Sequence, residues 1–296
     1  MRLWPIALVA CGRFDFDPVP DSGSNAPDAP VSTCDWTAGL PAFRPPTRVV
    51  SLSSPSDETD PALSPDGLTL YFASRRSGEY EVYRSVRASL DAPFETPVPL
   101  GPDVNTAAPE LTFRLDPAGT HAYLVREVAG NVDIYEATRP SPEAAFGAFT
   151  TVTAVTSPAA ELDPIESSDG LTLWFVTDRV GGMQDIWSAR RASLADPWQA
   201  PAVVPELATL RAEASPTIDA TQTVMVFTQV DPTTSGDLVV TRRPDSSSPW
   251  GPAEPLDAVN TALFEGEPEI SADGCELLFV STRDGNAWEI FQASAR

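Results

Sequence analysis

The side chains best suited to chemistry in this sequence are carboxylates that recur ahead of a proline. Glutamate lies three residues before the proline in four copies of the pattern, at Glu58, Glu161, Glu213 and Glu265, and Thr106 takes that place in the remaining copy. Acidic residues also stand directly before three of these prolines, at Asp60, Asp163 and Glu267. Such carboxylates can pair with arginine, bind a cation or cleave a glycan.

An arginine further along the chain accompanies three of these glutamates. The pairs are Glu58 with Arg76, Glu161 with Arg179, and Glu265 with Arg283. The copy with Thr106 has Val128 at the arginine position, so glutamate and arginine are lost together. This pattern predicts a structural salt bridge inside each of the three copies, because paired charges tolerate partial burial.

The fourth copy breaks the pairing, since Asp231 stands where the arginine would be while Glu213 is retained. Two acids without a matching cation form a candidate binding or metal site. Oxygen ligands of this kind suit Ca²⁺. A specialised site is therefore sought first around Glu213 and Asp231.

The sequence lacks most of the residues that several kinds of catalysis require. All 19 basic residues are arginine, and His121 is the single histidine. The sequence has no Gly-x-Ser-x-Gly elbow, which argues against a hydrolase of that type. His121 occupies a predicted strand position that Thr69 holds in another copy, so a structural histidine is expected. A glycan hydrolase remains an alternative because it needs only two or three inward carboxylates. Acids that recur copy by copy favour a structural role instead.

The carboxylates belong to a five-fold internal repeat. The aligned prolines are residues 61, 109, 164, 216 and 268, at intervals of 48, 55, 52 and 52. Each copy continues with a turn, often Asp-Gly, and then a strand such as 68–73. An alternating strand such as 80–83 follows, and the last strand, such as 94–98, contains proline, as an edge strand permits. Four strands at this period predict the blades of a β-propeller.

The ends of the chain predict the number of blades. The fifth copy stops after its third strand, and the missing strand pattern appears at 43–50. An N-terminal strand that completes the last blade would remove the two open edges. The sequence therefore predicts an all-β chain that forms a single propeller of five four-stranded blades over 43–296. The alternative is an open solenoid with a stray N-terminal strand.

The repeat resembles the PD40-type, WD40-like repeats of TolB-like propellers. The resemblance rests on Asp-x-Pro-x-x-Ser-x-Asp-Gly-x-x-Leu-Tyr/Trp-Phe, followed by a small residue and arginine, and is clearest at 60–76 and 163–179. It covers nearly all of 43–296 and implies the propeller architecture. It does not fix an activity, because one fold serves many functions.

The N-terminus predicts export and lipid anchoring. Arg2 precedes an apolar run, and Leu8-Val9-Ala10-Cys11 resembles a bacterial lipobox, which implies a signal peptide at 1–10 and lipidation of Cys11. The alternative is an irregular N-terminus with a chance cysteine. Residues 11–42 are rich in Pro, Asp and Ser and are expected to form a flexible tether. The other cysteines, Cys34 and Cys275, either form a disulfide, as export permits, or stay unpaired.

Composition limits the partners. The net charge of -23 excludes nucleic acid and leaves the lipid as the only membrane contact. We therefore expect a non-enzymatic propeller at the cell envelope, on the outer membrane or periplasmic face, which presents loops to a protein or glycan partner. No cofactor beyond the candidate Ca²⁺ is expected.

Overall fold

A computed structural model describes residues 34, 36, 39–231, 235–285 and 287–295. The regular elements of this part of the chain are all β-strands, so it contains no helix that could span a membrane. Twenty strands form five antiparallel sheets of four strands each. Each sheet is one blade.

The blades follow one another along the chain. Blade 1 contains β2 (Glu58–Leu63), β3 (Thr69–Ser74), β4 (Glu81–Val86) and β5 (Val98–Pro99). Blade 2 contains β6 (Glu110–Leu115), β7 (His121–Val128), β8 (Asn131–Thr138) and β9 (Thr150–Thr151). Blade 3 contains β10 (Glu161–Glu166), β11 (Thr172–Thr177), β12 (Asp185–Arg190) and β13 (Ala202–Val203). Blade 4 contains β14 (Ala212–Ile218), β15 (Val224–Val230), β16 (Gly236–Arg242) and β17 (Glu254–Pro255). Blade 5 contains β18 (Glu265–Ile270), β19 (Glu276–Ser281), β20 (Glu289–Ser294) and β1 (Thr47–Arg48).

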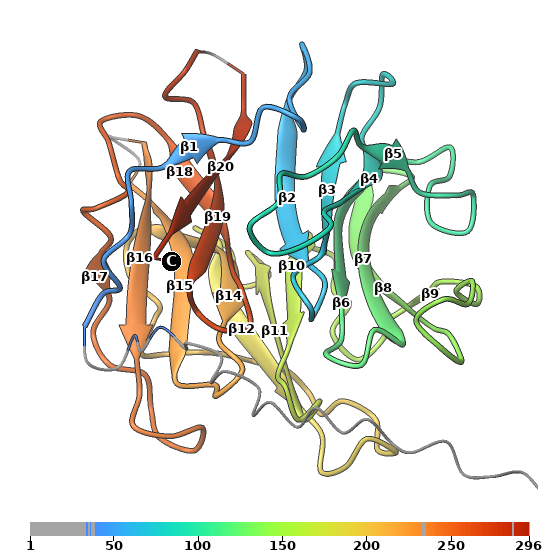
Figure 1. Cartoon of the computed structure of the whole chain (residues 1–296). Helices are drawn as coiled ribbons and strands as arrows, with labels where there is room; N and C mark the ends of the chain where they lie inside the picture. The colour runs from blue at the N-terminus through green and yellow to red at the C-terminus, as the bar shows by residue number, and fades with distance from the viewer. Residues whose placement is uncertain (1–33, 35, 37–38, 232–234, 286, 296) are drawn as a thin grey trace, which may run out of the picture. The chain divides into compact units, whose positions relative to one another are not determined.

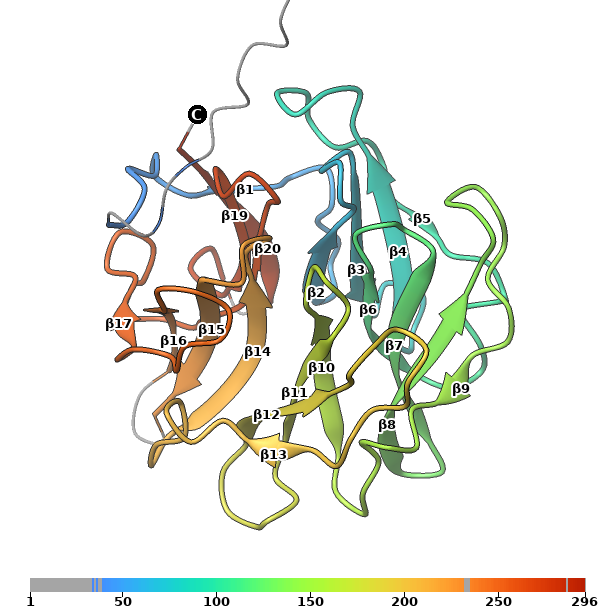
Figure 2. The ribbon, with the colours of Figure 1, turned by 90° about the horizontal axis from the view of Figure 1, so that it is seen from below.

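The first strands of the blades lie innermost in the ring (Figure 1 and Figure 2), and residues of all five line the cavities of its central channel. β2 contacts β6, β6 contacts β10, β10 contacts β14, β14 contacts β18, and β18 contacts β2 again. This closed circuit confirms the predicted five-bladed propeller.

The N-terminal strand closes the ring. β1 pairs with β20 through Thr47 opposite Gln292 and Arg48 opposite Phe291. The fourth strand of blade 5 therefore comes from the opposite end of the chain, as predicted. The open solenoid is excluded.

The hydrophobic core is divided among the five blade interfaces. Five clusters of buried side chains each join one blade to the next, for example Leu70 and Phe72 of blade 1 against Leu278 and Val280 of blade 5. Both faces of a second strand are covered by neighbouring blades, and all six residues of β11 and all six of β19 are buried. This explains why these strands read as continuous apolar runs.

The outer strands differ from the prediction in length and position. Each has only two residues, and β5 begins at Val98, after the expected aromatic start at Phe94. Phe94 is instead buried beneath Arg87, whose guanidinium carbon lies 4.5 Å from the ring centre. The aromatic residue anchors the connection into the outer strand, and this cation–π contact needs no strand pairing.

The chain meets blade 5 before β1. Cys34 and Cys275 form a disulfide with their Cα atoms 5.0 Å apart. Trp36 is buried, and its Nε1 donates to the Gly274 carbonyl at 2.8 Å. Two residues of the predicted tether thus contact the propeller. The predicted signal peptide, Cys11 and residues 12–33 lie outside the described residues.

Candidate functional site in the central channel

The glutamates predicted to form salt bridges are fully buried at the starts of the first strands. Arg76 lies 3.0 Å from Glu58, Arg179 3.1 Å from Glu161, and Arg283 3.1 Å from Glu265. Each arginine also donates to a main-chain carbonyl of the preceding connection, at Leu52, Val155 and Val259 respectively. These glutamates therefore fix the entry of the chain into each blade and are not free to bind a ligand.

Blade 2 contains a comparable ion pair, which the prediction missed, with its arginine at a different position of the second strand. Glu110 accepts a hydrogen bond from Arg126 Nε at 2.9 Å. Thr106 is not the equivalent of the glutamates; its hydroxyl donates to Glu110 at 2.7 Å. Thr106 was misaligned because Pro109 precedes Glu110, whereas the other blades carry their proline inside the strand. Val128 does stand at the arginine position, because it lies two residues beyond the ladder partner of the glutamate, as Arg76 does in blade 1. Arg126 is instead that ladder partner. Aligned on glutamate, at residues 58, 110, 161, 213 and 265, the intervals become 52, 51, 52 and 52.

In blade 4, both acids of the predicted site have protein partners. Glu213 is buried and accepts hydrogen bonds from the Thr209 hydroxyl at 2.5 Å and from Gln229 Nε2 at 3.3 Å. Asp231 instead pairs with Arg211 at 3.1 Å. Glu213 and Asp231 thus have different protein partners. Across the described residues, no cluster of three or more Asp, Glu, His or Cys side chains could hold a metal ion, which leaves the Ca²⁺ hypothesis without support.

The corrected repeat shows two layers of equivalent residues in the channel. The first layer, near the strand starts, contains Asp60, Thr112, Asp163, Ser215 and Glu267. The second layer, two residues further, contains Ala62, Arg114, Ile165, Thr217 and Glu269. Strand register shifts occur at the first layer in all five blades. Positive φ values of about 50° occur at four first-layer residues, namely Asp60, Asp163, Ser215 and Glu267. The bulge therefore turns these side chains out of the β-ladder.

The acids of the first layer are held by one another and by neighbouring strands. Glu267 Oε2 accepts from the Asp60 amide at 2.8 Å. Asp163 Oδ2 accepts from both the amide and the hydroxyl of Ser215 at 3.0 Å. We refer to Asp60, Asp163 and Glu267 as the acid layer.

Burial raises the pKa values of the three carboxyl groups in the acid layer. Desolvation, followed by the negative charge of Glu267, raises the pKa of Asp60 well above its usual range. Burial also raises the pKa of Asp163, against the hydrogen bonds from Ser215. It raises the pKa of Glu267 to about 8, against the hydrogen bond from the Asp60 amide. Like charges at close quarters cannot all ionise, so the layer shares protons at neutral pH.

The second layer is built around one ion pair. Arg114 NH1 lies 2.6 Å from Glu269 Oε2, and both side chains are buried. Glu269 also accepts from the Thr217 hydroxyl at 3.1 Å and from the Leu63 amide at 3.0 Å. Neither residue of the pair was predicted as a site residue from the sequence. The alignment on glutamate could have indicated them, because it places both residues at the same position of the repeat.

A cavity of about 300 Å³ lies above the acid layer. Half-buried aromatic side chains from the loops contribute to its wall, namely Tyr80, Phe264 and Trp288. Phe264 and Trp288 stack with their ring centres 4.7 Å apart. The cavity therefore combines carboxyl groups at its base with flat apolar rings at its rim.

His121 lies away from this cavity and is held as a structural ion. Its Nε2 is 3.1 Å from Glu136 and its Nδ1 is 3.5 Å from Glu166. Although burial lowers the pKa of His121, the hydrogen bonds to Glu136 and Glu166 raise it to about 9. The side chain is therefore an imidazolium at neutral pH, and a general base there is excluded.

Solved structures share the fold of this chain, but no protein family is identified for it. No protein-family model and no curated protein matches the sequence. Among solved structures, TolB from Acinetobacter baumannii is similar at a TM-score of 0.52 and 15% identity, over 82% of this chain and 56% of TolB. The chain thus spans little more than half the length of that protein. An endo-arabinase from Bacteroides thetaiotaomicron has a TM-score of 0.54 at 14% identity, over 82% of this chain and 97% of the enzyme.

A third similar structure is also a glycan-cleaving enzyme. The α-L-arabinofuranosidase of Podospora anserina has a TM-score of 0.53 at 11% identity, over 86% of this chain and 98% of the enzyme. At these identities the likeness concerns the fold alone. The chain is a five-bladed β-propeller, and its fold is similar to the structures of TolB and of these two glycan-cleaving enzymes.

Proposed function

We propose that this protein is a non-enzymatic binding propeller of the bacterial cell envelope that presents the loop end of its channel to a glycan or protein partner. The observation that carries the proposal is that three of the four acids in the two channel layers already have a partner within the ring. Glu269 pairs with Arg114, Asp163 with Ser215, and Glu267 with the Asp60 amide.

The spacing of the acids also favours binding over hydrolysis. After burial and the charge of Glu267, the charge of Asp163 contributes to the raised pKa of Asp60, so the two aspartate carboxyl groups lie near each other. Glycosidases of the two-carboxylate type place their carboxyl groups about 5–5.5 Å or about 6.5–9.5 Å apart, which leaves room for the sugar or a water. Carboxyl groups gathered in one buried layer offer less of that room.

The cavity above the acid layer suits a neutral glycan. Carboxyl oxygens accept hydrogen bonds from sugar hydroxyls, and the rings of Tyr80, Phe264 and Trp288 offer faces for the C–H surface of a pyranose. The net charge of -23 disfavours an acidic glycan. A neutral oligosaccharide is therefore the favoured occupant of the cavity. A loop of a partner protein is the alternative occupant.

One observation favours a glycan hydrolase as the second candidate. The pKa of Glu267 is raised to about 8 by burial, so this carboxyl is protonated at neutral pH, as a general acid must be. It lies in the same cavity as Asp60 and Asp163. Substrate binding would have to separate those two aspartates before a water could be activated.

The two candidates predict different results with neutral oligosaccharides. Titration calorimetry with xylo-, arabino- and cello-oligosaccharides, followed by chromatography of the products, separates them. Binding that Trp288→Ala weakens by about tenfold or more, with no new reducing ends, supports the binding propeller. New reducing ends that disappear in Glu267→Gln support the hydrolase. Leu210→Ala is the control, because Leu210 is exposed and does not line the cavity.

A pull-down from envelope extracts tests the protein partner. The same Trp288→Ala variant should lose the partner, and Leu210→Ala should retain it. If neither glycan nor protein engages this end of the channel, the proposed function fails.

The envelope location and the lipid anchor form the finer part of the proposal. The lipobox at residues 8–11 supports them. Membrane fractionation of the full chain, with mass spectrometry of the N-terminal peptide, tests them. A diacylglycerol adduct on Cys11 and release of the Cys11→Ala variant from the membrane are expected.

A further inference from the structure

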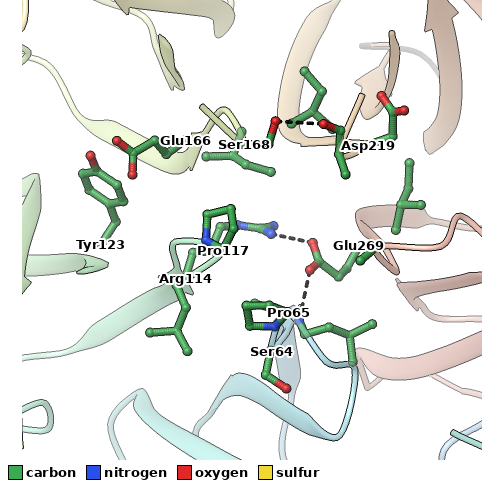
Figure 3. A pocket seen from close by; sticks show the side chains of 17 residues that line it. Ser64, Pro65, Arg114, Pro117, Tyr123, Glu166, Ser168, Asp219 and Glu269 are labelled. Carbon is green, nitrogen blue, oxygen red and sulfur yellow. Dashed lines mark hydrogen bonds and ion pairs between the residues drawn. The ribbon is translucent and has the colours of Figure 1, made fainter. Parts of the chain in front are cut away.

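The channel has a second cavity at its other end, beyond the Arg114–Glu269 layer. Its volume is about 170 Å³ (Figure 3). The inner strands end there in their hairpin turns, and the second turn residue of every blade lines the mouth. These five residues are Pro65, Pro117, Ser168, Ala220 and Ala272. We refer to this space as the turn-side cavity.

The wall of the turn-side cavity is largely apolar. Its aliphatic side chains come from the ends of the five inner strands, and they are Leu63, Leu115, Ile165, Ile218 and Ile270. For comparison, an engineered apolar cavity of about 150 Å³ accommodates benzene. The turn-side cavity therefore has room for a ring of about six heavy atoms.

Two buried donors in this wall have no acceptor of their own. Arg114 uses NH1 for Glu269, but its Nε has no hydrogen-bond partner among the described residues. The Oη of Tyr123 is also buried and makes no hydrogen bond at ordinary distance, although the Glu166 carboxylate lies beside it (Figure 3). Both residues line the turn-side cavity, and both are at least nine-tenths buried. An unsatisfied buried donor lowers the stability of the fold, so an acceptor brought into the cavity would be bound with preference.

We infer that the turn-side cavity is a binding site for a small uncharged molecule with an apolar body and one carbonyl-type oxygen. The oxygen would accept hydrogen bonds from Arg114 Nε and Tyr123 Oη. The apolar body would contact the aliphatic ends of the inner strands. This site lies at the opposite end of the channel from the proposed glycan site and does not depend on it.

The charges around the cavity favour a neutral acceptor over an anion. Glu269 already balances Arg114, with its carboxylate 2.6 Å away. Glu166 lines the same wall and is balanced by Arg191 at 2.5 Å and by His121. Asp219 adds a further carboxylate to the lining. An anionic ligand would therefore meet no uncompensated positive charge, while the unused Nε–H of Arg114 remains available to a neutral acceptor.

The site can be tested with three compounds of matched shape. Cyclohexanone carries the carbonyl, methylenecyclohexane replaces the oxygen by a CH₂ group, and cyclohexanecarboxylate adds a negative charge. Saturation-transfer NMR on the full chain measures their binding. The Nε–Hε region of a ¹H–¹⁵N spectrum reports on Arg114, whose signal is identified by its absence in Arg114→Lys. We expect cyclohexanone to bind at least about tenfold more tightly than either analogue and to shift the Arg114 signal.

Three variants and one control locate the site. Arg114→Lys keeps a positive charge for Glu269 but removes the Nε donor, and Tyr123→Phe removes the hydroxyl. Each should reduce the preference for cyclohexanone over methylenecyclohexane by about tenfold. Ala272→Trp, at an exposed position of the mouth, should abolish binding, whereas Ala195→Trp, at an exposed position elsewhere, should leave it intact.

The inference is overturned by any of three results. One is the absence of saturation transfer to cyclohexanone at its solubility limit. Another is equal affinity for the ketone and the hydrocarbon. The third is unchanged binding in Ala272→Trp. If Arg114→Lys does not fold, Tyr123→Phe and Ala272→Trp still decide the question.

Discussion

Arg114 of blade 2 and Glu269 of blade 5 meet across the channel at 2.6 Å, although blade 1 lies between their strands in the ring. Their positions are 155 residues apart in the sequence. Because both side chains are buried, the pair links two blades that share no hydrophobic interface. Removing one partner leaves an uncompensated charge inside the ring.

We expect Arg114→Met to lower the free energy of unfolding by about 3–5 kcal/mol, because Glu269 would be left buried without its cation. Denaturant unfolding at neutral pH measures this change. Glu254→Gln is the matched control: it breaks the exposed Arg242–Glu254 pair and should cost about 1 kcal/mol or less. A similar cost for both variants would show that the channel pair adds nothing beyond a surface pair.

The acid layer predicts that stability falls as the pH rises. The folded pKa of Glu267 is about 8, above its ordinary value of 4.5, so the folded state holds a proton that the unfolded state releases between these values. Stability is greatest below about pH 4.5 for this group and is lost towards pH 8, by at most about 1.4 kcal/mol per pH unit for one proton.

Glu267→Gln should flatten this part of the pH profile, because the amide does not titrate. Melting temperatures of the variant and of the unmodified protein between pH 5 and pH 8.5 test this expectation. The raised pKa of His121 also lowers stability with rising pH, mainly between about 6.5 and 9, and this part should persist in the variant. A profile identical to that of the unmodified protein contradicts the assignment to Glu267.

His121 should remain protonated well above neutral pH. Its pKa of about 9 depends on hydrogen bonds to Glu136 and Glu166, which oppose the effect of burial. Since it is the single histidine, its ring signals can be followed by NMR without assignment. Glu136→Gln should move the midpoint down, and a midpoint near 6.5 in the unmodified protein would contradict the ion pair.

Blade 4 lacks the arginine that the equivalent glutamate has in the other four blades. Gln229 lies opposite Glu213 in the ladder, as Arg126 lies opposite Glu110 in blade 2. We expect Gln229→Arg to supply the missing ion pair and to raise the free energy of unfolding by about 1 kcal/mol, with Arg126→Gln as the reciprocal control. Thermal unfolding of both variants tests it; a destabilising Gln229→Arg would mean that the neutral clamp of Thr209 and Gln229 is the better fit.

The disulfide between Cys34 and Cys275 closes a loop of about 240 residues. In the chain-entropy model, Cys34→Ser should therefore lower the free energy of unfolding by about 5–6 kcal/mol. Denaturant unfolding with and without reductant measures it. Reductant should destabilise the unmodified protein and leave the variant unchanged; an equal response of both would place the effect elsewhere.

The sequence predicted the architecture because each blade repeats the same local signals. An Asp-Gly turn, an apolar second strand and a proline in the outer strand recur at a nearly constant period. The missing strand at the C-terminus and its pattern at 43–50 then determined the closure, which the pairing of Thr47 with Gln292 confirms. These signals are local in sequence, so no structure was needed to find them.

The channel was predicted less well because its chemistry joins blades. Arg114 and Glu269 occupy the same repeat position, yet nothing local shows that they reach each other across blade 1. The proline at 109 also shifted the alignment of blade 2, which concealed the Glu110–Arg126 pair. Likewise, Glu213 was predicted to be free because the sequence does not show that Gln229 and Thr209 hydrogen-bond to it.

The position of the disulfide has a mechanical consequence. β1 is held to β20 by only two residue pairs, and a pull on β1 alone would peel it from blade 5. Cys34, however, precedes β1 and is bonded to Cys275 at the hairpin turn of that blade. A force applied through the chain before Cys34 is therefore carried by a covalent bond into blade 5, and the two-residue strand that closes the ring bears no load.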